Sequence, residues 1–139
     1  MGDLEKAALT ALFAVLVYVI GQFVQKFLLE PIQEQRRLVG EVAYVLVFYA
    51  NVYTPLSTED EQEYMEAQKS IRKLAASLRA TLWTIPFYRL LERLRIVWRR
   101  QAIFKAATGL IGYSNSLKVH QAKKKHSEDI ENALNIRWE

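Results

Sequence analysis

The chain has 139 residues, of which 51% are apolar and 24% are charged, and its net charge is +4. This length fits one domain, and the high apolar fraction excludes an intrinsically disordered chain. The chain contains no cysteine. Disulfides, iron–sulfur clusters, thiolate zinc sites and cysteine nucleophiles are therefore excluded as well.

An apolar run near the N-terminus predicts a membrane span. Residues 9–29 read LTALFAVLVYVIGQFVQKFLL, and at about 1.5 Å per residue they cover roughly 31 Å, close to the thickness of a hydrocarbon core. The alternative is a buried helix of a soluble protein, but a chain this small offers little protein in which to bury it. A cleaved signal peptide is less favoured, because the start of the chain is acidic and Glu30 and Pro31, instead of a small-residue cleavage site, follow the run.

The flanking charges predict the orientation of this span. Lys6 is the one basic residue before it, whereas Lys26, Arg36 and Arg37 lie at its end or just after it. Basic residues flank membrane helices preferentially on the cytoplasmic side. We therefore expect the N-terminus outside and the bulk of the chain in the cytoplasm.

The sides of the expected membrane helix differ in side-chain size. One stripe at spacings of three and four consists mostly of small or polar residues: Ala7, Ala11, Ala14, Tyr18, Gly21 and Gln25. A second stripe is bulky: Leu9, Phe13, Leu16, Ile20, Phe23 and Phe27. Small residues allow helices to approach closely in lipid, and the heptad spacing is typical of a left-handed bundle. The small stripe therefore predicts an oligomer interface, and the alternative is a chance pattern of common residues.

After the span, Pro31 indicates either the first turn of a new helix or a kink in a continuing one. A second helix is expected over residues 32–53. Its second half, residues 42–53, is apolar all round, which predicts burial. A second membrane helix over residues 38–56 and a β-strand are the alternatives.

Signals for further helices follow. Thr54–Glu59 is expected to be a loop, and Ser57 or Thr58 is expected to cap a helix that ends at Pro86. Apolar residues of that helix recur at spacings of three and four: Tyr64, Ala67, Ile71, Leu74, Leu78 and Leu82. A short helix over residues 87–95, a turn over 95–100 and a helix over 101–117 come next.

The polar stretch Lys118–Lys125 is expected to be a linker. Ser127 is then the expected cap of a final helix, with Ile130, Leu134 and Trp138 on one face. The predicted fold is therefore all-α: a membrane segment over residues 1–30, then a small, strongly basic helical domain over residues 31–139 in the cytoplasm.

The charge is concentrated in one part of the chain. Residues 69–125 hold fourteen basic residues and a single acidic one, Glu92, which is a net charge of +13. Such a segment attracts anions. Three interpretations stay open: a solvated surface partly neutralised by acidic residues 59–66, adhesion to anionic lipid headgroups, and binding of a nucleotide or nucleic acid.

Four arginines are the candidate anion-binding residues: Arg89, Arg93, Arg99 and Arg100. Arginine suits bidentate recognition of phosphate, and Arg89 and Arg93 are four residues apart, so they share a helix face. The aromatic residues nearby are Trp83, Tyr88 and Trp98. They are either stacking partners for a base, or core residues or interfacial anchors.

The pattern of reactive residues predicts no enzyme, no metal site and no cofactor. The two histidines, His120 and His126, are six apart and do not share a helix face. Gly109 and Gly112 lie inside an expected helix, where they indicate close packing instead of a phosphate-binding loop. The acidic residues 59–66 fit the start of a helix.

Four strings carry a resemblance to known proteins: LLEPIQEQRR, VFYANVY, TIPFYRLLERL and LIGYSNSL. Over roughly residues 25–117 the chain resembles a recurrent type of small bacterial protein with one N-terminal anchor and a helical domain. The resemblance implies a bacterial, inner-membrane, single-pass protein and carries no activity with it.

These expectations favour a non-enzymatic anchoring, assembly or accessory subunit. Its expected partners are the lipid bilayer and either copies of itself or a larger membrane complex. One alternative is a ligand-gated membrane effector whose arginines bind an anionic nucleotide or nucleic acid. The other is a peripheral binder of anionic lipid headgroups.

Overall fold

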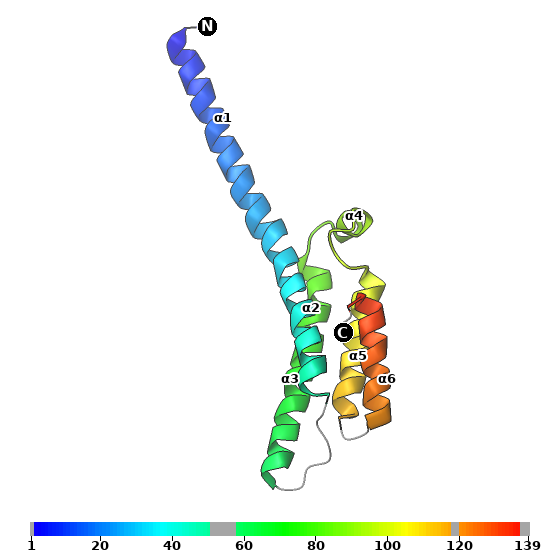
Figure 1. The fold of residues 1–139 in the computed structure, drawn as a ribbon. Helices are drawn as coiled ribbons and strands as arrows, with labels where there is room; N and C mark the ends of the chain where they lie inside the picture. Colours follow the sequence, from blue (N-terminus) through cyan, green and yellow to red (C-terminus); the bar gives the residue numbers. More distant parts are fainter. Residues whose placement is uncertain (1, 51–57, 118–119, 137–139) are drawn as a thin grey trace.

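A long helix projects from a group of shorter helices in the computed structural model, which describes residues 2–50, 58–117 and 120–136 (Figure 1). The elements in chain order are α1 (Asp3–Val24), the π-helical turn η1 (Gln25–Leu29), α2 (Glu30–Phe48), α3 (Thr58–Thr84), α4 (Tyr88–Arg93), α5 (Arg100–Asn115) and α6 (His120–Leu134). No strand occurs in these described ranges. The predicted all-α fold is confirmed for them.

The first three elements form one continuous helix, Asp3–Phe48. Pro31 does not end this helix. Of the two alternatives, a new helix or a continuing one, the structure therefore has the continuing helix. Proline has no N–H, and in a regular helix its ring would clash with the carbonyl four residues earlier, here that of Phe27. The π-helical turn just before Pro31 accommodates this, because the backbone N–H of Glu30 donates to the carbonyl of Gln25, five residues back.

The helical domain is built by successive packing of neighbouring helices. α2 packs on α3, α3 on α5, and α5 on α6. Large apolar residues that are almost completely buried come from all four of these helices and from the turn after α5: Val42, Leu46, Ile71, Leu78, Ile103, Leu110, Leu117, Ile130 and Leu134. Burial of each such side chain contributes about 1.5–3 kcal/mol.

α2 buries one side only. Leu38, Val39, Val42 and Leu46 face the core, whereas Tyr44, Val47 and Phe48 are exposed. The prediction that the apolar stretch is buried all round is therefore wrong for the part up to residue 50. Residues 38–48 belong to the same helix as α1 and are neither a strand nor a separate membrane helix, and residues 51–56 lie outside the described part.

The expectations for α3, α4 and α5 are confirmed within about two residues at their ends. α3 buries Ala67, Ile71, Leu74, Leu78 and Leu82, and Tyr64 is half-buried. A non-helical stretch separates α4 from α5, as expected for residues 95–100. The expected loop Thr54–Glu59 is wrong at its end, because Thr58 and Glu59 belong to α3; residues 54–57 and the side chains of the expected caps lie outside the described residues.

The expectation for the final helix is wrong at its start. α6 begins at His120, so residues 120–125 are helical and are not a linker. Ser127 lies inside the helix, where its hydroxyl donates to a carboxylate oxygen of Glu131 at 3.1 Å. Lys123 is buried and donates to the carbonyl of Tyr49 at 3.1 Å, which joins α6 to the end of α2. Trp138 lies outside the described residues.

The two glycines of α5 lie at its contact with α6. A Cβ atom on Gly109 would lie 2.7 Å from Cγ1 of Ile130, and one on Gly112 would lie 2.6 Å from Cε1 of His126. Real Cβ contacts of this length essentially do not occur. The prediction that these glycines serve close packing is confirmed.

The hydroxyl of Tyr113 is buried and lacks a hydrogen-bond partner within the described part of the chain. Burial raises the pKa of this phenol to about 12. We expect Tyr113→Phe to raise the free energy of unfolding by about 1 kcal/mol, because it removes an unsatisfied buried hydroxyl. The fold favours the neutral phenol, so the unsubstituted protein loses stability as the pH rises from about 10, the unfolded pKa, to about 12.

Chemical denaturation of both proteins in mild detergent, at neutral pH and across this alkaline window, measures both effects. The Phe variant is expected to lose less stability than the unsubstituted chain between these pH values. Equal stability and equal alkaline loss in the two proteins would mean that the hydroxyl finds a partner in solution.

Candidate functional site

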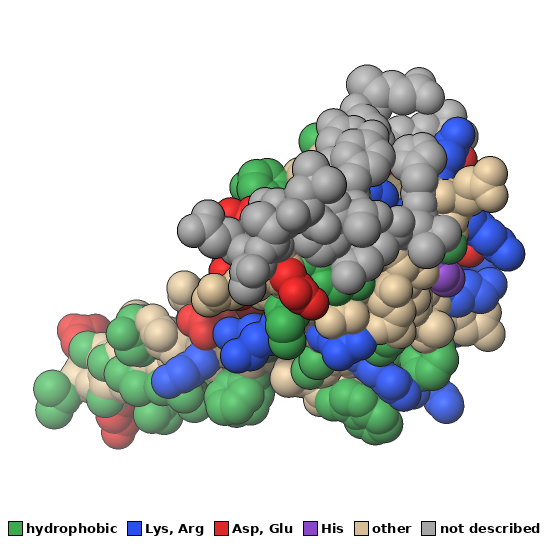
Figure 2. Space-filling model, turned by 90° about the horizontal axis from the view of Figure 1, so that it is seen from below, with side chains coloured by type: hydrophobic (Ala, Val, Ile, Leu, Met, Phe, Trp, Pro, Cys, Tyr) green, Lys and Arg blue, Asp and Glu red, His purple; other side chains and the backbone are tan. Residues whose placement is uncertain are grey.

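The projecting helix α1 is exposed along its whole length, from Asp3 to Val24. It contains an 18-residue window with a mean hydropathy of 2.2, none of which is buried inside the protein. The helix is therefore long and apolar enough to cross a membrane. In Figure 2, hydrophobic side chains cover most of the projecting helix, and most of the visible Lys and Arg side chains lie over the rest of the molecule.

The small stripe of α1 continues onto the exposed side of α2. In an uninterrupted α-helix the same spacing would lead to Leu28, Ile32, Gln35, Val39, Val42 and Leu46, which α2 buries or half-buries in the domain. The π-helical turn adds one residue, and one residue corresponds to about 100° around the axis. The stripe therefore continues at Leu29, Gln33, Arg36, Gly40, Ala43 and Val47, of which five are exposed and Ala43 is half-buried.

A second group of residues gathers where α4 turns between α3 and α5, and we name residues 83–100 the α4 corner. Tyr88 ties this corner to α2, because the amide nitrogen of Gln35 donates to its hydroxyl at 3.1 Å and to Oγ1 of Thr81 at 3.0 Å. A guanidinium nitrogen of Arg36 also donates to the carbonyl of Ile96, at 3.4 Å. The α4 corner is thus held beside residues 35 and 36 of the long helix.

Two residues with a left-handed backbone conformation bend the chain at the α4 corner. Phe87, just before α4, has a φ of 54°, and Arg95, just after it, has a φ of 59°. This conformation costs a non-glycine residue about 1–2 kcal/mol, so the burial of Tyr88 and Leu91 has to offset it. The two sharp turns fold the flanking residues back around the short helix.

The fold brings three of the four predicted arginines together. Arg89, Arg93 and Arg99 line one surface hollow of about 460 Å³. The other lining residues are Glu92, Arg95 and Val97. Arg95 was not among the predicted residues, and its left-handed backbone is a tertiary feature that periodicity does not reveal.

Arg100 points elsewhere. The centre of its guanidinium lies 5.7 Å from the ring of Trp83 and 5.9 Å from the ring of Tyr88. Its backbone N–H donates to a carboxylate oxygen of Glu92 at 3.3 Å. Arg100 therefore does not line the hollow with the other three.

The three aromatic residues of this region also separate. Tyr88 is buried, and Trp98 is half-buried and donates its indole N–H to the carbonyl of Leu134 at 3.0 Å. Trp83 is 80% exposed. Two of the three are therefore core residues, and only Trp83 is free to contact a ligand or a lipid surface.

The α4 corner also exposes apolar side chains that the sequence analysis did not single out. Phe87 is 76% exposed, Leu90 56% and Leu94 59%. Leu90 and Leu94 are four residues apart and share one side of α4, Phe87 comes directly before the helix in its left-handed conformation, and Tyr88 and Leu91 are buried. The four-residue spacing is the signal that could have revealed Leu90 and Leu94.

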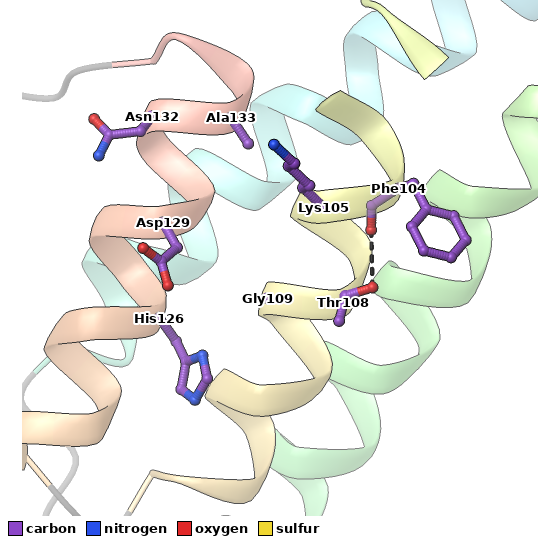
Figure 3. Close-up of a pocket in the computed structure, with 8 residues that line it drawn as sticks. All are labelled: Phe104, Lys105, Thr108, Gly109, His126, Asp129, Asn132 and Ala133. Atoms are coloured by element: carbon purple, nitrogen blue, oxygen red, sulfur yellow. Dashed lines mark hydrogen bonds between the residues drawn. The ribbon is translucent and has the colours of Figure 1, made fainter. Parts of the chain in front are cut away.

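A further pocket, of about 640 Å³, lies between α5 and α6 (Figure 3). His126 and Asp129 project into it from α6, and Lys105 lies across from them on α5. In the described part of the chain no hydrogen bond joins the His126 ring to Asp129, and no group of three or more metal-ligating side chains occurs. The residues that line this pocket therefore assemble no catalytic constellation.

Comparisons of the chain with protein-family models, with curated proteins and with solved structures find no match.

Proposed function

We propose that this chain is a non-enzymatic membrane anchor that oligomerises and holds a basic helical domain at the cytoplasmic face of a bacterial inner membrane. It acts there as an anchoring, assembly or accessory subunit, either with copies of itself or within a larger membrane complex. The observation that carries this proposal is the continuous helix Asp3–Phe48, whose first half is exposed and apolar and whose second half belongs to the domain core.

This continuity has a mechanical consequence. No flexible linker separates α1 from α2, so the direction of the membrane helix is transmitted to the domain. The first fully buried residue of α2 is Ile32, three residues after Leu29. The domain therefore sits directly at the membrane surface, with the N-terminus on the opposite side of the bilayer.

The position of the small stripe relative to the buried side of α2 supports self-association. The bulk of the domain lies on the buried side of α2, whereas the small stripe continues on its exposed side. A second copy can therefore approach through Ala14, Gly21 and their neighbours without displacing the helical domain.

Replacing Gly21 with leucine tests this interface. The larger side chain is expected to push neighbouring membrane helices apart and to weaken the oligomer about tenfold, the effect of a modest overpacking cost. Sedimentation of the full chain in detergent measures the change. Ile20→Ala, a large change in side-chain volume on the bulky stripe, is the control, and loss of the oligomer in the control alone would place the interface on the bulky stripe.

Mass spectrometry of the material that co-purifies with the full chain from native membranes tests the proposed role. Recovery of the chain with itself or with one membrane complex supports the proposal. Recovery with a stoichiometric nucleotide would favour the ligand-gated effector, for which the grouping of Arg89, Arg93 and Arg99 is the supporting observation.

A further inference from the structure

We infer that the α4 corner is a second membrane-contact site, which binds the phosphate groups of anionic phospholipids through Arg89, Arg93, Arg95 and Arg99 and inserts Phe87, Leu90 and Leu94 between the headgroups. The inference rests on the proposed function, because it requires α1 to lie in the bilayer. It goes further, because it assigns a lipid class to the site and gives the domain one orientation on the surface.

The position of the α4 corner is the first argument. The corner is tied to Gln35 and Arg36 by hydrogen bonds, and Gln35 lies six residues beyond Leu29. Six residues correspond to about 9 Å along the helix, which puts Gln35 at the outer edge of a headgroup layer roughly 5–8 Å deep. Figure 1 shows α4 at the end of the helical domain from which α1 emerges. With the apolar run in the bilayer, the corner lies at the headgroups.

The apolar side chains are the second argument. Phe87, Leu90 and Leu94 are each more than half exposed, although they sit in a domain that has its own buried core. Exposed apolar groups that cluster next to cationic ones are typical of helices that lie in a membrane interface. Tyr88 and Leu91 are the residues that α4 buries in the core, so insertion of the three exposed side chains leaves the fold intact.

The charges of the hollow are the third argument. Four guanidinium groups and one carboxylate line it. Within the described residues, the side chains of Arg89, Arg93, Arg95 and Arg99 form no hydrogen bond or ion pair, since both ion pairs there belong to Arg37. Guanidinium groups bind phosphate oxygens in a bidentate manner, and an anionic leaflet supplies phosphates at this depth.

A single fluorescent label reports whether the α4 corner enters the membrane. The chain contains no cysteine, so Leu90→Cys allows the full-length protein to be labelled at one position with an environment-sensitive dye. The labelled protein is placed in nanodiscs of phosphatidylcholine alone, or of phosphatidylcholine with phosphatidylglycerol. The dye is expected to shift to the blue and to resist an aqueous quencher only in the discs with the anionic lipid.

Matched charge variants assign the effect to the hollow. Changing Arg89, Arg93, Arg95 and Arg99 to glutamine is expected to abolish the shift, because each arginine contributes about fivefold to partition onto an anionic surface. The control removes the same charge at exposed lysines elsewhere: Lys69, Lys73, Lys124 and Lys125. The control set is expected to keep the shift, and a dye on Met65→Cys, in α3, is expected to stay in water throughout.

The outcomes separate the two proposals. Protein that fails to enter nanodiscs contradicts the membrane anchor itself. Protein that enters them but keeps the Leu90→Cys dye in water beside phosphatidylglycerol overturns the lipid site alone. The lipid site is also overturned if the control set loses the shift as the arginine set does, or if ATP binds the detergent-solubilised chain through these arginines while the anionic lipid has no effect.

Discussion

A chain that carries Leu16→Asp and Val19→Asp is expected to leave the membrane fraction. Both residues are exposed on α1 and lie near the middle of the apolar run. Each charged residue at the centre of a membrane helix costs about 3 kcal/mol on insertion scales, so the pair costs about 6 kcal/mol, roughly four orders of magnitude in the partition between lipid and water. Vesicle flotation and alkaline extraction measure the loss.

The matched control places the same two charges outside the membrane. Tyr44 and Val47 are exposed on α2, so Tyr44→Asp with Val47→Asp is expected to leave membrane retention unchanged. If the unsubstituted chain fractionates as a dissolved monomer without detergent, the apolar run is not in lipid. The anchor, the orientation and the lipid site would then all be wrong.

Gly109→Leu is expected to lower the free energy of unfolding by about 3 kcal/mol. Even a Cβ atom at this position would lie 2.7 Å from Cγ1 of Ile130, and Ile130 is itself fully buried. Either Ile130 has to shift within the core or α5 and α6 have to separate, and overpacking a core costs about 1–3 kcal/mol. Denaturant unfolding of the full chain in detergent measures the change.

Gly40→Leu is the matched control for this substitution. Gly40 lies in α2, and nothing lies within 4 Å of the position of its Cβ. Leucine has a better helix propensity than glycine, so this variant is expected to be at least as stable as the unsubstituted chain. Equal destabilisation by both substitutions would mean that the α5–α6 contact is looser than the structure indicates.

Local sequence patterns were sufficient to predict a helix long and apolar enough to cross a membrane, and also α3 to α5. α1 has a continuous apolar run, α3 and α5 have apolar residues at a period of 3.6, and Pro31 and Pro86 mark positions where regular helical hydrogen bonding is interrupted. These are short-range properties of the chain. The packing role of Gly109 and Gly112 could be predicted in the same way. Glycine destabilises a helix interior, so its presence there indicates a close contact.

The start of α6 could not be read in this way. Residues 120–125 are polar and carry no apolar stripe, so they resemble a linker. Tertiary contacts decide the matter, because the buried Lys123 donates to the carbonyl of Tyr49 and makes this first part of α6 a member of the domain. The exposed side of α2 was missed for a similar reason. A helix that is apolar on all sides does not reveal on how many of those sides other helices pack.

In the candidate site, too, some features follow from the sequence and others from the tertiary structure. The sequence by itself determined that the chain is helical, that its first part is apolar enough for a membrane, and that arginines crowd the segment around α4. Only the tertiary structure decided that Arg95 joins Arg89, Arg93 and Arg99 while Arg100 turns away. It also decided that the small stripe of α1 continues on the exposed side of α2. The physical reason is that one extra residue in a π-helical turn rotates everything after it by about 100°, and no periodicity within either half of the helix contains that rotation.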